Sequence, residues 1–152
     1  MLLLSDKPIF TIHSPLGDIQ KLGHTPYGER RIINILGGTV QGPKLKGKIL
    51  PGGADWQIVR ADGVVHLQAR YTAETETGGR ILIDAEGYRY GPAEVMERLG
   101  RDETVDPSLY YFRTFMRFET ADPASAWLNR ILAIGSGARE NKAVRIEVFE
   151  VL

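Results

Sequence analysis

The chain contains no cysteine among its 152 residues. It therefore has no disulfide bond, no thiolate nucleophile, and no cysteine-ligated zinc or iron–sulfur centre. The three histidines, His13, His24 and His66, show neither a His-x-His nor a His-Glu-x-x-His spacing. We therefore expect neither a bound metal ion nor a cofactor.

The chain also lacks an excess of charge. Nineteen Lys and Arg residues balance nineteen Asp and Glu residues, and no run of basic residues makes a local exception. Binding to the phosphates of nucleic acids or to anionic membranes depends on such an excess. We therefore expect neither nucleic acid nor membrane as a partner.

Long apolar runs are missing as well. A membrane-spanning helix needs about 20 consecutive, mostly apolar residues. The apolar start at 1–4 gives way at once to polar residues, and it is too short for the core of a signal peptide. We expect a soluble, cytoplasmic protein, and a single domain over residues 1–152.

Glycine, by contrast, is abundant in the first third of the chain. Nine of the seventeen glycines lie between Gly17 and Gly53, where they separate short β-branched and aliphatic runs. This spacing is typical of turns, bulges and corners between strands. It predicts strands at 9–13, 31–36, 44–50 and 56–60.

Two longer runs alternate with the period of a β-strand. In 64–74 one face carries Val65, Leu67, Ala69, Tyr71 and Ala73, and the other carries His66, Gln68, Arg70, Thr72 and Glu74. In 80–90 the face of Ile81, Ile83 and Ala85 lies opposite that of Arg80, Leu82, Asp84 and Glu86. The turn residues at 77–79 join the two runs into a hairpin.

The remaining elements complete an all-β fold. We expect strands at 110–120, 131–134 and 144–152, a short helix from Pro92 to just before Gly100, and a helical turn capped by Asp122. About nine to ten strands with one or two short helices predict a closed antiparallel β-barrel, since closure removes exposed edges. Periodicity leaves open whether a polar strand face meets water or lines a pocket.

Several segments together resemble the domain of unknown function 3237 family. They are 28–30, 37–43, 47–56, 69–71, 111–113 and 127–129. The ordered set is specific, whereas any single segment would be weak, and it spans nearly the whole chain. The resemblance implies a compact, dimeric β-barrel in a family whose members mostly lack an assigned activity.

Asp55 is the first candidate for catalysis. It follows Gly52-Gly53 and precedes Trp56, and a carboxyl beside an indole in a poorly solvated place has a raised pKa. Such a group suits general acid or base catalysis. The alternative is that Asp55 caps a turn through backbone N–H groups.

Arg70 and Glu86 are the other catalytic candidates. Arg70 shares a strand face with His66 and is suited to binding an oxyanion or a substrate carboxylate, with Glu86 as a second carboxylate. The alternative is a solvated face on which these side chains form cross-strand ion pairs.

Aromatic residues supply the candidates for substrate binding. Arg113 lies among aromatic residues and suits either a cation–π contact or an anion clamp. The full set of substrate-binding candidates is Trp56, His66, Tyr71, Arg113 and Trp127. The alternative for the aromatics is that they fill the core.

Three functions remain open on these grounds. The first is a cofactor-independent lyase or isomerase that dehydrates, isomerises or cyclises a small, largely apolar, carbonyl-bearing metabolite by proton transfer. The second is a non-catalytic carrier of a hydrophobic metabolite. The third is a structural protein whose exposed aromatic residues bind a second copy in a homodimer or bind a partner protein.

Overall fold

The computed structural model describes residues 3–152, so Met1 and Leu2, the start of the expected domain and of the expected apolar segment, lie outside the described residues. Within residues 3–152 the chain forms ten strands: β1 Phe10–Thr25, β2 Gly28–Ile35, β3 Gly38–Gln41, β4 Gly47–Ile49, β5 Ala54–Val59, β6 Val65–Thr75, β7 Arg80–Tyr90, β8 Tyr111–Thr120, β9 Ala133–Glu140 and β10 Ala143–Glu150. One α-helix, α1 Ala93–Gly100, and two 3-10 helices, η1 Pro107–Leu109 and η2 Pro123–Arg130, connect them.

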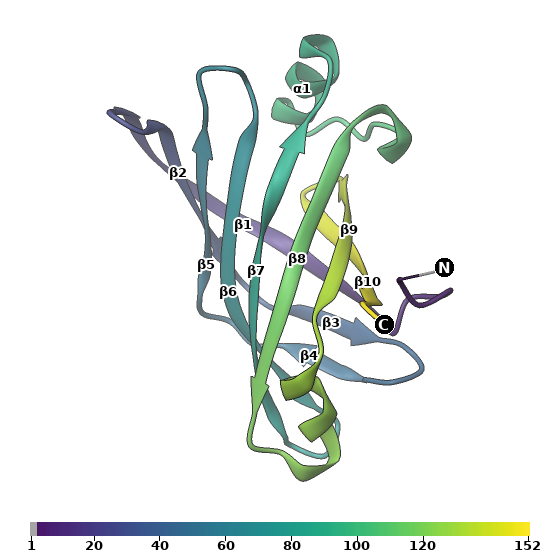
Figure 1. Ribbon diagram of the computed structural model, residues 1–152. Coiled ribbons are helices and arrows are strands. Elements are labelled where there is room, and N and C mark those ends of the chain that lie inside the picture. Colours follow the sequence, from purple (N-terminus) through teal and green to yellow (C-terminus); the bar gives the residue numbers. More distant parts are fainter. Residues whose placement is uncertain (1–2) are drawn as a thin grey trace.

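The strands form one antiparallel sheet whose pairings return on themselves (Figure 1). Neighbours follow the order β10-β9-β8-β7-β6-β4-β3-β1-β2-β5, and β1 also pairs with β10 while β5 pairs with β6. The sixteen-residue β1 makes this possible, because its residues 10–15 pair with β10, residues 11–13 also pair with β3 on the other side, and residues 16–25 pair with β2. The all-β antiparallel class predicted from the sequence is confirmed, as a ring of hydrogen-bonded strands.

The apolar face of each long strand points into this ring. In the β6–β7 hairpin Tyr71 lies opposite Ile83 and Ala69 opposite Ala85, so the two apolar faces coincide. They join the core of Phe10, Ile12, Val40, Ile81, Met116, Leu128 and Val148, which are almost completely buried. The alternating polar faces of β6 and β7 therefore meet the solvent.

Gly53 is a position where only glycine fits. Its φ is +77°, and a Cβ there would collide with the carbonyl oxygen of Arg70 on β6. The absence of a side chain lets β5 begin directly against β6. This close approach fixes the position along β6 at which Asp55, two residues later, points into the ring.

Three expectations about local structure are corrected. The helix begins at Ala93 rather than Pro92, because Pro92 has an extended backbone (ψ 145°) and serves as the N-cap residue. Residues 38–41, for which the sequence predicts no strand, form β3, and β9 continues through 135–137, beyond the strand predicted at 131–134. The glycines 135 and 137 lie in β9 because Phe112, Thr114 and Ile146 occupy the space of their missing side chains.

Helix α1 covers one end of the ring. It follows β7, and its Leu99, with Val95 and Met96, packs in a second apolar cluster with Val65 and Phe112. No helix within the described part of the chain is both long and apolar enough to cross a membrane.

Candidate functional site

Asp55 lies on the face of β5 that points into the ring. Its Oδ2 accepts a hydrogen bond from Gln57 Nε2 (2.8 Å), and its Oδ1 accepts one from the backbone N–H of Gln68 (3.1 Å). Gln57, two residues on, is almost fully buried, whereas Trp56 between them points outward and is 38% exposed. The alternation of β5 thus separates the carboxylate from its neighbouring indole.

Burial is the dominant influence on Asp55, and it raises the pKa of this carboxyl above the ordinary value of 3.8. The hydrogen bonds from Gln57 and Gln68 oppose this rise, as do the positive charges of Arg89 and Arg31. Burial therefore disfavours ionisation of the carboxyl, while its two hydrogen bonds hold it in a fixed orientation.

A cavity of about 70 Å³, here called the inner cavity, lies beside Asp55. Its lining is mainly apolar, with Ile12, Ile33, Leu67, Ala69, Phe112 and Ile146, and its polar groups include Ser14, Gln57, Tyr71 and Thr114. Among residues 3–152, the hydroxyls of Tyr71 and Thr114 have no hydrogen-bond partner although both are buried. A buried hydroxyl without a partner is costly, so these groups are candidates for ligand contact.

Tyr71 is coupled to the carboxylate. Burial raises the pKa of its phenol, and the charge of Asp55 raises it further. The hydroxyl is therefore neutral at any physiological pH and available as a hydrogen-bond donor.

Arg31 of β2, Arg89 of β7 and Arg139 of β9 form what we call the arginine set. Arg89 and Arg139 line the inner cavity together with Ile33. All these residues and Arg31 also line a second cavity of about 590 Å³, the vestibule, which extends to α1. Arg89, Arg139 and Ile33 thus form the partition between the two cavities, and Arg31 lies on its vestibule side.

Arg89 is the most deeply buried member, at 5% exposure. Burial and the like charges of Arg139 and Arg31 lower its pKa to about 9, which still leaves the guanidinium protonated at neutral pH. Its guanidinium carbon lies 5.7 Å from the centroid of the Phe112 ring, a cation–π contact that holds it in place. The Arg31 Nη2 donates to Gln57 Oε1 (2.8 Å), which links the partition to Asp55.

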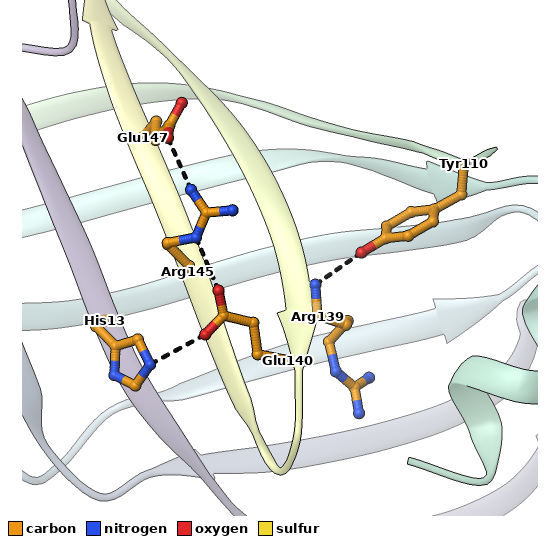
Figure 2. A network of polar contacts seen from close by, with 6 residues as sticks. All are labelled: His13, Tyr110, Arg139, Glu140, Arg145 and Glu147. Carbon is orange, nitrogen blue, oxygen red and sulfur yellow. Dashed lines mark hydrogen bonds and ion pairs between the residues drawn. The ribbon is translucent and has the colours of Figure 1, made fainter. Parts of the chain in front are cut away.

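Arg139 is held in place through its backbone and through its side chain. Its backbone N–H donates to the Tyr110 hydroxyl (2.8 Å) (Figure 2). Its Nη2 donates to Asp102 (3.2 Å). Its neighbour Glu140 points to the other side of β9, where it contacts His13 and Arg145. One strand therefore carries an interior cation beside an exterior ion-pair network.

The three catalytic candidates do not come together. Arg70 and Glu86 lie on the outward faces of β6 and β7, because their strands turn the apolar faces inward. The Arg70 side chain is 58% exposed and lies 4.0 Å from Asp84, while Glu86 Oε1 lies 2.8 Å from His66 Nε2. Asp55 is the member of the trio that reaches the inner cavity.

The substrate-binding candidates divide in the same way. Tyr71 lines the inner cavity, whereas Trp56 and His66 belong to outward faces. Arg113 lies outside over the Tyr111 ring at 5.6 Å and donates to the Phe112 carbonyl. Trp127 packs against the core from η2 with Lys44 over its ring at 5.4 Å, and it lines neither cavity.

Sequence reasoning missed Gln57 and the arginine set. A usable signal was present, since Arg89 continues the face of Ile81, Ile83 and Ala85 at the same period of two. A lone polar residue on an otherwise apolar strand face marks an interior site better than a wholly polar face does. No group of three or more His, Asp or Glu residues suited to a metal ion occurs within the described residues.

Comparison with known proteins agrees with this architecture. A protein from Rhodopseudomonas palustris strain TIE-1 with the name UPF0311 protein is 46% identical over 98% of this chain and 97% of its own. The crystal structure of the conserved protein of unknown function RPA1785 from Rhodopseudomonas palustris matches with a TM-score of 0.91 and 43% identity, over 100% and 99% of the two chains. A protein from Acinetobacter baumannii described as beta-barrel like matches with a TM-score of 0.84 and 40% identity, over 99% and 97%.

A more distant structure shares the fold alone. It is described as an enzyme from Penicillium herquei and matches with a TM-score of 0.74 at 18% identity, over 100% of this chain and 97% of its own. The family described as "Protein of unknown function (DUF3237)" matches residues 5–151, nearly the whole chain. On this match and these relatives, the chain belongs to the DUF3237 family.

Proposed function

We propose that this protein is a closed β-barrel enzyme that transfers a proton on a small, largely apolar, carbonyl-bearing molecule without a cofactor. Dehydration, isomerisation and cyclisation are the reactions of this kind, so the enzyme is a lyase or an isomerase. The observation that carries the proposal is the Asp55 carboxyl, with a raised pKa, beside a mainly apolar cavity that also contains an unpartnered hydroxyl within the described residues.

The raised pKa suits acid–base work at neutral pH. A general base is most effective when its pKa lies near the working pH, and burial moves the pKa of Asp55 in that direction. The ionised carboxylate removes a proton from the carbon next to the substrate carbonyl. The same group, now protonated, returns that proton to another position or to a departing hydroxyl.

The developing charge on the carbonyl oxygen needs donors on the opposite side. Tyr71 offers a buried neutral hydroxyl, and Arg89 offers a buried guanidinium at the edge of the same cavity. Donors fixed before the reaction in a poorly solvated site stabilise an oxyanion strongly. Arg89 thus takes the role that Arg70 was expected to fill.

The distant match gives limited support. A protein with this fold is described as an enzyme, which makes catalysis on this architecture reasonable, although a shared fold does not transfer an activity.

Hydrogen–deuterium exchange tests the proposal without knowledge of the natural substrate. A panel of small apolar ketones and oxo acids is incubated with the protein in D₂O, and the loss of α-proton signals is followed by ¹H NMR. We expect the wild type to accelerate exchange in some of these compounds and Asp55→Asn to return the rate to background. Asp84→Asn, the same change on the outward face of β7, is the matched control and should behave as wild type. Exchange by Asp55→Asn at the wild-type rate would refute the role of Asp55.

A carrier is the second candidate, favoured by the size of the vestibule. Its volume of about 590 Å³ falls within the range of roughly 300–1,000 Å³ that is usual for small-molecule sites. In that case Asp55 and the arginine set orient a ligand and catalyse nothing. Native mass spectrometry of the purified protein separates the two, since a stoichiometric apolar ligand together with no exchange activity indicates a carrier.

The homodimer expected from the sequence stays a proposal. The outward aromatic residues of β7 and β8, Tyr88, Tyr90, Tyr111 and Phe115, are each more than 40% exposed and offer a surface for it. Sedimentation at micromolar concentrations tests it, and a strict monomer would contradict it.

A further inference from the structure

We propose that Arg31, Arg89 and Arg139 bind the carboxylate of an amphipathic small molecule whose apolar body lies in the vestibule. This inference concerns the site of the proposed function, and only the choice of an oxo acid, explained below, rests on that function. The binding itself is independent of any reaction.

The arginine set is built from three strands that are distant in sequence. Their side chains meet at one place because β2, β7 and β9 all direct these positions to the partition. The like charges are close enough that Arg139 and Arg31 both contribute to lowering the pKa of Arg89. Bringing like charges together out of water is costly, and a bound anion removes that cost.

The hydrogen-bonding capacity of the set is incompletely used. Within the described part of the chain, the buried Nε atoms of Arg31, Arg89 and Arg139 have no acceptor. Arg89 is 5% exposed, and the Arg139 side chain is 11% exposed, so solvent satisfies these groups poorly. Guanidinium groups with free N–H donors are well matched to carboxylate oxygens.

The charge balance favours a monoanion. Three guanidiniums face the buried carboxyl of Asp55 and Asp102, the half-exposed partner of Arg139, so even with both carboxyls ionised one positive charge lacks a counterion. Asp62 and Glu97 also line the vestibule, but Asp62 pairs with Arg60 and Glu97 is exposed on α1. Solvent screens these rim carboxylates, whereas the buried guanidiniums are screened much less.

The rest of the vestibule calls for an apolar body. Its lining includes Ile19, Val59, Val65, Met96 and Leu99, and its volume suits a molecule of moderate size. The inner cavity, at about 70 Å³, is smaller than the cavity of about 150 Å³ that holds a benzene ring in an engineered core. A ligand therefore places its body in the vestibule and only a small group beyond the partition.

This division indicates the substrate class. A carboxylate at the partition places the carbons attached to it near the inner cavity, where Asp55 lies. An apolar 2- or 3-oxo acid has its carbonyl and its acidic carbon in this position. Taken with the proposed function, the arrangement points to an apolar oxo acid as the substrate.

Calorimetric titration with matched probes tests the carboxylate site directly. The probes are 4-phenylbutanoate, its neutral analogue 4-phenylbutan-1-ol, and inorganic phosphate. We expect wild-type protein to bind the carboxylate about 10- to 100-fold more tightly than the alcohol, the value expected for hydrogen bonds to a charged group. Equal binding of acid and alcohol, or phosphate binding as tight as that of the acid, would overturn the proposal.

Variants locate the site. Arg89→Met should remove the preference for the acid, while Arg117→Met, on the outward face of β8 beside Asp84, should keep it. If Arg89→Met fails to fold, the affinities of the wild type for the acid and the alcohol still show whether the protein prefers a carboxylate. A preference that survives in a folded Arg89→Met protein would contradict the assignment.

The outcome is separable from that of the proposed function. Asp55→Asn should still prefer the acid, because Asp55 contributes no positive charge. A carboxylate preference without any deuterium exchange leaves the anion site standing and removes the catalytic proposal. Exchange on neutral ketones without a preference for the carboxylate probe leaves the catalytic proposal standing and removes the anion site.

Discussion

The side-chain amide of Gln57 connects Asp55 to the arginine set. Its Nε2 donates to Asp55 Oδ2 at 2.8 Å, and its Oε1 accepts from Arg31 Nη2 at 2.8 Å. The second bond fixes the amide orientation, because a guanidinium has only donors and must face the amide oxygen. Gln57 therefore presents an N–H group to Asp55, which favours the ionised carboxylate and opposes the effect of burial on its pKa.

Replacement of Gln57 should accordingly raise the pKa of Asp55 further. In Gln57→Leu the side chain keeps its bulk but donates nothing, so burial acts with less opposition. Titration of the Asp side-chain carboxyl carbons by ¹³C NMR measures the change, and the pH profile of exchange should move to higher pH with it. Gln68→Leu is the control, since Gln68 contacts Asp55 through its backbone N–H only. An unchanged Asp55 titration in Gln57→Leu would show that the amide does not tune the carboxyl.

The pH dependence of stability should reveal the same carboxyl. Because the folded pKa of Asp55 lies above the unfolded value of about 3.8, the folded protein holds this proton more tightly. Its contribution to stability is greatest at low pH and is lost as pH rises through the folded pKa.

Asp55→Asn removes this dependence. The free energy of unfolding of Asp55→Asn should therefore increase relative to that of the wild type as pH rises from below 3.8 towards neutrality. Urea unfolding of both proteins across this range measures it. If the wild type instead gains stability relative to Asp55→Asn as pH rises, the fold stabilises Asp55 in its ionised form.

The class of fold could be predicted from the sequence because it rests on local information. The alternation in 64–74 and 80–90 is a direct consequence of strand geometry, and β7 has the predicted limits of Arg80 and Tyr90. β3 could not be predicted because it is four residues long, too short to show a period of two.

The site could be predicted only in part, because periodicity does not say which face points inward. The neighbouring glycines and tryptophan single out Asp55, and Gly53 fixes where β5 begins against β6. Arg70 and Glu86 were chosen from polar faces, whereas the ring turns its apolar faces inward. Arg31, Arg89 and Arg139 converge only through pairings of distant strands, which no local pattern contains.

The outward position of Arg70 and Glu86 leads to a third prediction. Arg70→Met and Glu86→Gln should leave the exchange rate unchanged, because neither side chain lines the inner cavity or the vestibule. Exposed ion pairs contribute about 0–1 kcal/mol, so the free energy of unfolding should change by no more than that. A large loss of exchange in a well-folded variant would restore these residues to the catalytic site.

Close packing at Gly137 leads to a fourth prediction. A Cβ at this position would lie 2.6 Å from the Phe112 ring, which itself lines the inner cavity. Gly137→Ala should therefore reduce the free energy of unfolding by about 1–3 kcal/mol through overpacking. Gly100→Ala is the matched control, since nothing lies within 4 Å of its added Cβ, and helix propensity favours the change by up to about 1 kcal/mol. Equal stability of the two variants in urea unfolding would contradict this packing.

The Tyr71 hydroxyl provides the sharpest separation of stability from function. Within residues 3–152 it is buried without a hydrogen-bond partner, an arrangement that costs about 1–3 kcal/mol. Tyr71→Phe keeps the ring and removes this cost, so the variant should be at least as stable as the wild type.

The same change removes a donor to the developing oxyanion, and loss of one such donor slows a reaction by about 100- to 1,000-fold. Thermal unfolding and deuterium exchange, measured on the same samples, check the two effects. Tyr88→Phe, in a half-exposed ring beside His66 on the outward face of β7, should change neither. A more stable but slower Tyr71→Phe enzyme would mean that the unpaired hydroxyl is kept for its substrate, whereas unchanged exchange would leave Arg89 as the donor at the carbonyl.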